Sequence, residues 1–136
     1  MRYLLDTNVW IAAIKGVESV KERLERTPST DIVLSPIVLG ELHLGVEKSQ
    51  LKKKNAVAVD LIAQGFEVIP LTAETSRVYA QIRGQLEQRG KIIGANDLWI
   101  AAQALAEGVC LVTDNTAEFS RVSGLKWENW LASTSP

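Results

Sequence analysis

Short runs of apolar residues alternate along this chain with longer segments whose apolar residues recur every three or four positions. The short runs are typical of strands buried on both faces, and the longer segments are typical of amphipathic helices. Strands are expected at 3–5, 32–34, 66–69 and 109–112, with a short fifth strand near 126–127. Helices are expected at 8–15, 17–24, 36–48, 50–64, 72–89 and 97–107. This alternation predicts a three-layer α/β/α fold around a mainly parallel sheet of four to five strands.

Particular residues mark where these helices begin and end. Ser35 followed by Pro36 predicts a helix start, because serine caps a helix and proline is preorganised for its first turn. Gly108 is expected to end the helix 97–107, which is apolar almost all round and is therefore predicted to be buried. Asn96 is expected to cap the start of that helix.

Length and composition limit the class of protein. The 136 residues fit one domain, expected over 1–131, followed by a flexible tail at 132–136. The chain has 15 Lys and Arg against 16 Asp and Glu, and 46% of its residues are hydrophobic. These values exclude a disordered chain and a strongly basic nucleic-acid binder. One cysteine and one histidine exclude a disulfide scaffold and the Cys/His zinc motifs.

The apolar runs also bear on where the protein is found. No apolar stretch is as long as a membrane helix. The opening residues 1–6 look superficially like a signal peptide, but Asp6 interrupts them and no small-residue cleavage site follows. A cytoplasmic protein without a membrane segment is therefore expected.

Acidic residues stand where a parallel sheet places its ligands, beyond the carboxyl ends of the strands. Asp6 follows the first strand, and Asp114 and Asn115 follow the fourth. Asp97 lies in the first turn of the apolar helix, and Glu41 lies in the helix after the second strand. Converging carboxylates repel one another, and a hard divalent cation such as Mg²⁺ or Mn²⁺ removes that repulsion. A water held by such an ion is a nucleophile for a phosphodiester.

Each acid taken alone also has a structural explanation. Asp6 would cap the helix that follows it, and Asp97 would complement a helix dipole. Glu41 would pair with Lys48, and the pair 114–115 would form an ordinary turn. The case for a site rests on their combination.

Polar neighbours of these acids are candidates for orienting them. Thr7 and Asn8 follow Asp6 directly, and Thr113 precedes the second polar pair, so each is expected to hydrogen-bond at the site. His43 is two residues from Glu41 and is expected to point away from that face of the helix.

Four short blocks of this chain resemble PIN-domain ribonucleases. They lie at 4–8, 40–49, 96–102 and 112–125, in order, so that the resemblance covers about residues 1–131. Each block alone is short, and the four in register are specific. Within the family, the chain is most similar to VapC-type toxins of toxin–antitoxin (VapBC) systems.

The resemblance implies a PIN-like fold and a Mg²⁺- or Mn²⁺-dependent endoribonuclease that cleaves RNA, with transfer RNA as the expected target. It implies that Asp6, Glu41 and Asp97 are the metal-binding acids. The family pattern assigns the fourth position of the site to Asn115, while Asp114 remains the alternative. It also implies a VapB-type antitoxin, whose C-terminal segment covers a groove beside the site, and a homodimer.

Two other functions remain open from the residues themselves. A phosphatase or phosphotransferase with an aspartyl nucleophile typically has a second Asp two residues after the first, where this chain has Asn8. A non-catalytic partner-binding module would keep the fold and lose the chemistry. The presence of Asp6, Glu41 and Asp97 argues against that module.

Overall fold

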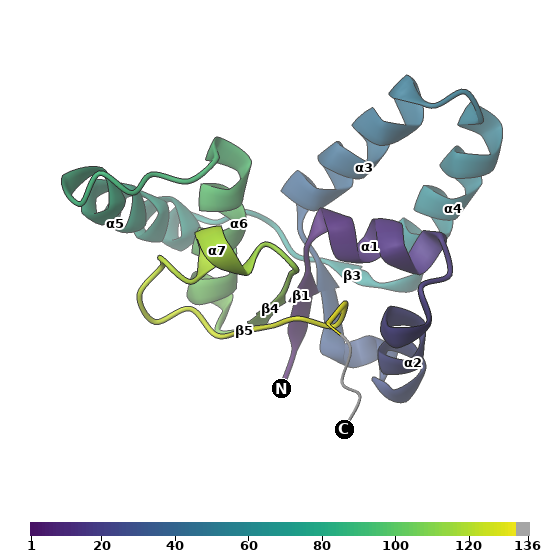
Figure 1. Cartoon of the computed structure of the whole chain (residues 1–136), viewed down its shortest axis with the longest axis horizontal. Helices are drawn as coiled ribbons and strands as arrows, with labels where there is room; N and C mark the ends of the chain where they lie inside the picture. Colours follow the sequence, from purple (N-terminus) through teal and green to yellow (C-terminus); the bar gives the residue numbers. More distant parts are fainter. Residues whose placement is uncertain (133–136) are drawn as a thin grey trace.

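A computed structural model describes residues 1–132, and five parallel strands form one sheet at its centre (Figure 1). The strand order is β3-β2-β1-β4-β5. The strands are β1 (Tyr3–Leu5), β2 (Ile32–Leu34), β3 (Glu67–Val68), β4 (Cys110–Val112) and β5 (Trp127–Glu128). The fully parallel sheet confirms the predicted fold class. Strand β3 is shorter than expected because it is an edge strand with both residues exposed, paired only with β2.

Helices lie on both sides of this sheet, with α5, α6 and α7 on the left of Figure 1 and α1 to α4 on the right. They are α1 (Thr7–Ile14), α2 (Glu18–Arg26), α3 (Pro36–Lys48), α4 (Lys52–Gly65), α5 (Ala73–Gln88), α6 (Ala95–Glu107) and α7 (Thr116–Phe119). A 3₁₀ turn, η1 (Ser29–Asp31), precedes β2. Neither η1 nor α7 was predicted, because a single turn is too short to show a helical period.

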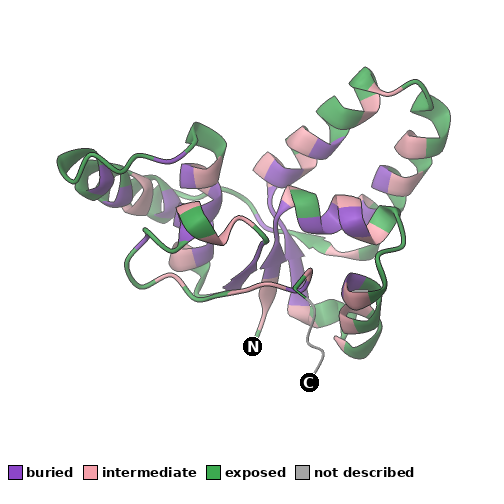
Figure 2. Ribbon diagram, in the orientation of Figure 1, coloured by how far each residue is buried: buried purple, intermediate pink, exposed green. Residues whose placement is uncertain are grey.

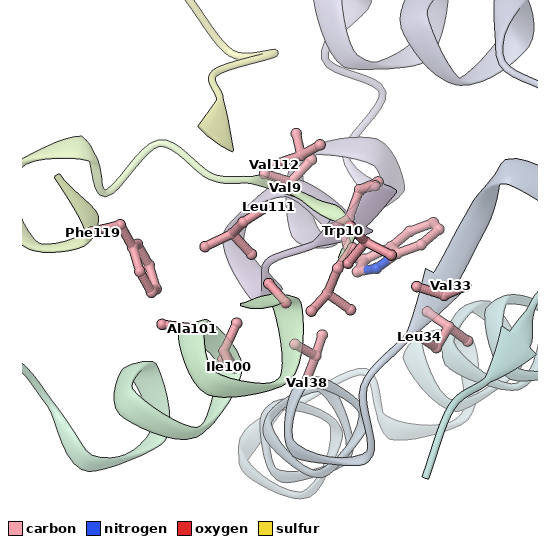
Figure 3. Packing of buried hydrophobic residues seen from close by; sticks show 14 of the residues in the cluster. Val9, Trp10, Val33, Leu34, Val38, Ile100, Ala101, Leu111, Val112 and Phe119 are labelled. Carbon is pink, nitrogen blue, oxygen red and sulfur yellow. The ribbon is translucent and has the colours of Figure 1, made fainter. Parts of the chain in front are cut away.

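The core lies where the helices meet the central strands. Strands β2 and β4 are buried along their whole length, as Figure 2 shows in purple. Side chains of α1, α3 and α6 pack onto them: Figure 3 shows Val9 and Trp10 of α1, Val38 of α3 and Ile100 of α6 around this centre. Burying one such side chain contributes about 1.5–3 kcal/mol, so this core is a main source of the stability of the domain.

Helix α6 shows one correct and one wrong boundary prediction. Gly108 ends the helix in a left-handed conformation with φ of +66°, as expected. Asn96 does not cap its start, because the helix begins at Ala95 and Gly94 holds the capping position. The Asn96 side chain is therefore directed from the first turn of α6 toward α3, where it hydrogen-bonds to Glu41.

The C-terminal segment is fastened to the body of the domain through Trp130. Its ring lies 5.4 Å from that of Tyr3, and the Arg23 guanidinium lies 4.8 Å from its centroid. The Trp130 indole donates to Glu128 at 3.0 Å, and Arg23 pairs with the same carboxylate at 2.8 Å. The predicted tail at 132–136 lies almost wholly outside the described residues, which end at Ala132.

No helix within residues 1–132 combines the length and apolar character needed to cross a membrane.

Cys110 lies in the core, and burial raises the pKa of its thiol to about 11. A thiol of that pKa is protonated at neutral pH and is not a nucleophile.

Replacing Ser35 with alanine is expected to lower the free energy of unfolding by about 1 kcal/mol. The predicted cap is confirmed: the buried Ser35 hydroxyl accepts a hydrogen bond from the Ile37 amide at 3.1 Å, which satisfies one amide at the start of α3. Urea denaturation measures the change, with the exposed Ser123→Ala as the control. Equal stability of the two variants would contradict the assignment of the cap.

Candidate active site

Asp6 lies at the carboxyl end of β1, where the sheet order changes direction between β1 and β4. One carboxylate oxygen accepts from the Thr7 amide at 2.8 Å, and Asp6 thereby caps α1. The other oxygen accepts from the Thr113 hydroxyl at 2.9 Å. The capping explanation for Asp6 is therefore correct, and it coexists with a position beside other acids.

Glu41 reaches the same region from α3. Its carboxylate accepts from the Thr7 hydroxyl at 2.6 Å and from the Asn96 amide at 3.4 Å. Among the described residues Glu41 forms no ion pair with Lys48, so that explanation is wrong. Thr7 thus links the carboxylates of two acids that are far apart in the sequence.

Asp97, on the first turn of α6, is joined to α7 by Asn115. The Asn115 side-chain amide donates to Asp97 at 3.3 Å and also donates to Glu118. Glu118 accepts a further hydrogen bond from the Gly94 amide at 3.3 Å. Glu118 was not among the predicted site residues. Its position three residues after Asn115 places the two side chains on the same side of a helical turn, which could have indicated their contact.

Asp6, Glu41, Asp97 and Glu118 are called the acid cluster below. Asn115 and Asp114 occupy different places relative to it. The backbone amide of Asn115 donates to the buried Thr113 hydroxyl at 3.0 Å, and the side chain of Asn115 is directed toward Asp97. Asp114 is exposed, and its carboxylate is 3.5 Å from the Asn8 amide. The structure therefore brings Asn115 next to Asp97 and leaves Asp114 at the rim.

The pKa values of Asp97 and Asp6 are raised, whereas hydrogen bonds from Asn115, Asp97 and Gly94 lower the pKa of Glu118. The pKa of Asp97 is raised to about 7, first by burial, then by its hydrogen bond with Glu118 and by the charges of Asp6, Glu118 and Glu41. Burial also raises the pKa of Asp6, and the charges of Glu41 and Asp114 add to it, against the hydrogen bonds from Thr113 and Thr7. Within residues 1–132 every Lys or Arg ion pair involves other carboxylates. The cluster thus gathers carboxylates that form no ion pair with a Lys or Arg of the described residues, although the charge of Arg121 acts on Glu118.

The potential metal ligands of this cluster are oxygen atoms: three carboxylates on β1, α3 and α6, the carboxylate of Glu118, and the hydroxyl groups of Thr7 and Thr113 beside them. Such donors suit a hard divalent cation. In the described part of the chain, no three His, Cys, Asp or Glu side chains are already close enough together to hold an ion. Thr7, Thr113 and Asn115 each donate one hydrogen bond to these carboxylates, and an oxygen that accepts one hydrogen bond keeps a second lone pair for an ion.

Residues 3–125 match the sequence model of the PIN domain. The chain belongs to the PIN-domain family. It is 43% identical to a protein of Rickettsia felis named ribonuclease VapC2, over 96% of this chain and 98% of that one. It is 35% identical to a protein of Shigella flexneri named tRNA(fMet)-specific endonuclease VapC, over 96% of this chain and 98% of the relative.

A solved structure of the same family has the same fold. The crystal structure of VapBC2 from Rickettsia felis, bound to a DNA fragment from its promoter, contains a chain that is 42% identical to this one. The two superpose with a TM-score of 0.89, over 96% of this chain and 99% of that chain. The PIN-like fold and the predicted family are therefore confirmed. PIN-domain ribonucleases generally depend on a divalent metal, which agrees with the oxygen donors of this cluster.

Proposed function

We propose that this PIN domain is the ribonuclease toxin of a VapBC toxin–antitoxin pair. The observation that carries this proposal is a cluster of acids at the carboxyl edge of the sheet, in a chain 43% identical to a named VapC ribonuclease. Fold alone would not be enough, because one fold hosts many functions. The phosphatase alternative lacks support, since Asn8 stands where a second aspartate is typical.

Asp6, Glu41 and Asp97 are the residues that would hold the ion, Mg²⁺ or Mn²⁺. When bound, the ion would polarise the scissile phosphate and lower the pKa of a water at that phosphate. Thr7 and Thr113 hold the carboxylates of Glu41 and Asp6 in place through hydrogen bonds of 2.6 and 2.9 Å. His43 is exposed on α3, and the proposed chemistry assigns it no role.

Asn115, supported by Glu118, fills the fourth position of the site in this proposal. Its amide is 3.3 Å from Asp97, whereas Asp114 is exposed at the rim. A neutral amide contributes no charge, and Glu118 supplies the carboxylate that the asparagine lacks. This explains how the site keeps a fourth acid with asparagine at position 115.

RNA is the substrate, and transfer RNA is the class we propose. The support is the Shigella flexneri relative, which is named for one transfer RNA and aligns over nearly its whole length. Residues 1–131 would act as one catalytic domain, and cleavage of cellular RNA would take place in the cytoplasm.

A VapB-type antitoxin is the proposed partner, and an apolar groove beside the acids suits its C-terminal segment. This groove of about 240 Å³ runs between α1, α3 and α4, with Glu41 at its edge. Its apolar lining comes from Ile11, Ile14, Leu42, Val46 and Val59. An amphipathic helix laid into such a groove would bury its apolar face and cover the acids. We also propose a homodimer.

Cleavage of cellular RNA tests the proposed function. Purified antitoxin-free protein is incubated with total RNA and with transfer RNA, in Mg²⁺, in Mn²⁺ and in excess chelator. Discrete cuts that need the metal, mapped by sequencing the new RNA ends, are the expected result. Failure to cut any RNA by a folded, metal-binding preparation would contradict the proposal.

Replacing Thr113 with valine is expected to weaken metal binding by about 10–100-fold, because partners that orient metal ligands contribute that much. The buried Thr113 hydroxyl donates to Asp6 and accepts from Asn115, and valine keeps the shape while removing both bonds. Calorimetric titration with Mn²⁺ measures the affinity. Thr75→Val is the matched control, since Thr75 is equally buried but lies on α5, away from the acids. Equal affinity in the two variants would show that Thr113 does not orient the site.

A further inference from the structure

A second hollow lies on the other side of Glu41 from the apolar groove. It has a volume of about 270 Å³ and lies between α3 and the start of α6. Its lining consists of Pro36, Ile37, Gly40, Glu41, Leu44 and Asn96. Because Glu41 also belongs to the acid cluster, the hollow adjoins the position proposed for the cleaved phosphate.

The walls of this hollow combine apolar surface with one amide. Ile37 is half-buried, and Leu44 has 52% of its surface exposed on the solvent side of α3. Asn96 faces them from α6, held by its 3.4 Å hydrogen bond to Glu41. An asparagine amide offers both a donor and an acceptor, so this wall can bind the edge of a polar ring.

Gly40 leaves the hollow open. A Cβ atom built at Gly40 meets no atom within 4 Å, and the residue lies inside a helix without a positive φ. Glycine in a helix interior costs about 1 kcal/mol relative to alanine, so α3 would be more stable with a side chain there. Because Gly40 lines the hollow, a side chain at this position would project into open space there.

We propose that this hollow holds one unpaired base of the substrate RNA, from a nucleotide next to the cleaved phosphate. This inference rests on the proposed ribonuclease function and assigns a base-binding subsite to it. The base packs against Ile37 and Leu44, and its edge hydrogen-bonds to the Asn96 amide. Proteins commonly bind single-stranded RNA by stacking a base on an aromatic or Arg side chain and hydrogen-bonding to the base edge, and here the aliphatic side chains of Ile37 and Leu44 provide the packing surface.

The place and the lining of the hollow favour a base over a protein segment. Pockets for drug-sized ligands span about 300–1,000 Å³, so a hollow just below that range suits one ring system. A partner helix has a longer apolar surface available between α1, α3 and α4. The hollow, in contrast, opens beside the acids, where the RNA strand must pass.

Filling the hollow tests the subsite. Gly40→Leu adds a side chain that favours helix, and Gly84→Leu is the matched control, because Gly84 also lies inside a helix with no atom within 4 Å of its Cβ position. Binding is measured by fluorescence anisotropy in excess chelator, so that the RNA stays intact. The probes are a short mixed-sequence RNA and an abasic oligomer of the same length. Circular dichroism checks the fold, and Gly40→Ala replaces the leucine variant if that variant is misfolded.

Wild type and Gly84→Leu are expected to bind the base-bearing RNA about tenfold more tightly than the abasic oligomer, and Gly40→Leu is expected to lose most of that ratio. In metal-containing buffer, Gly40→Leu still cuts RNA but loses its preference for the base beside the cut. An unchanged binding ratio in Gly40→Leu would overturn the subsite. A change in particle mass caused by Gly40→Leu alone would assign the hollow to an interface between copies and also overturn it. Absence of cutting by wild type would refute the ribonuclease function while the binding ratio still tests the subsite.

Discussion

Asp97→Asn is expected to abolish metal-dependent RNA cleavage, with a loss of about a thousandfold or more. The substitution keeps the shape of the side chain and removes the charge of a carboxylate that links α6 to Asn115 and Glu118. The metal-free variant is expected to be more stable than wild type near pH 8, because charge repulsion from Asp6, Glu118 and Glu41 is relieved. Since Asp97 is half-exposed, solvent screening limits this gain to about 1 kcal/mol. Single-turnover cleavage in buffer that contains metal measures the first effect. Urea denaturation in chelator measures the second.

Asp114→Asn is the matched control, because it makes the same chemical change at the exposed rim. It is expected to retain most of the cleavage activity and to leave the stability of the metal-free protein nearly unchanged. If Asp97→Asn cut RNA as fast as wild type, or if both variants lost activity equally, the division of the acids into cluster and rim would be wrong.

Without metal, the protein is expected to lose stability as the pH rises from about 4 to about 7. The folded-state pKa of Asp97 is raised from 3.8 to about 7, and that of Asp6 is raised in the same direction. The folded state therefore holds protons that the unfolded chain has already released in this range, and stability falls as they leave. Urea denaturation in chelator at a series of pH values measures the decline.

Added metal is expected to reverse this dependence. A divalent ion binds the deprotonated acids, so its affinity rises with pH up to about 7 and its stabilising effect rises with it. Asp97→Asn is the control, since it should flatten both curves. A metal-free stability that rises between pH 4 and pH 7 would show that repulsion within the cluster is not the dominant pH-dependent effect.

Much of the fold followed from local patterns in the sequence. The buried runs at 3–5 and 32–34 could be recognised because strands covered on both faces are continuously apolar. Asp6, Glu41 and Asp97 could be proposed as a cluster because the carboxyl ends of parallel strands meet at one edge of the sheet. These expectations depend only on periodicity and topology.

The hydrogen bonds between elements could not be read from the sequence. The Thr7 hydroxyl contacts Glu41 across 34 positions, and the Asn96 amide contacts it across 55, so both depend on how α1, α3 and α6 are oriented. Glu118 was missed because α7 is a single turn, too short for a periodic signal. Asn96 was taken for a cap because the start of α6 was placed two residues too late.

The most direct test of the metal-dependent site is the cleavage rate of transfer RNA as a function of Mn²⁺ concentration, for wild type, Asp97→Asn and Asp114→Asn. The predicted result is a rate for wild type and Asp114→Asn that rises to saturation with Mn²⁺ and is absent in chelator, with no cleavage by Asp97→Asn at any concentration. Cleavage by wild type in chelator, or by Asp97→Asn at the wild-type rate, would contradict the account.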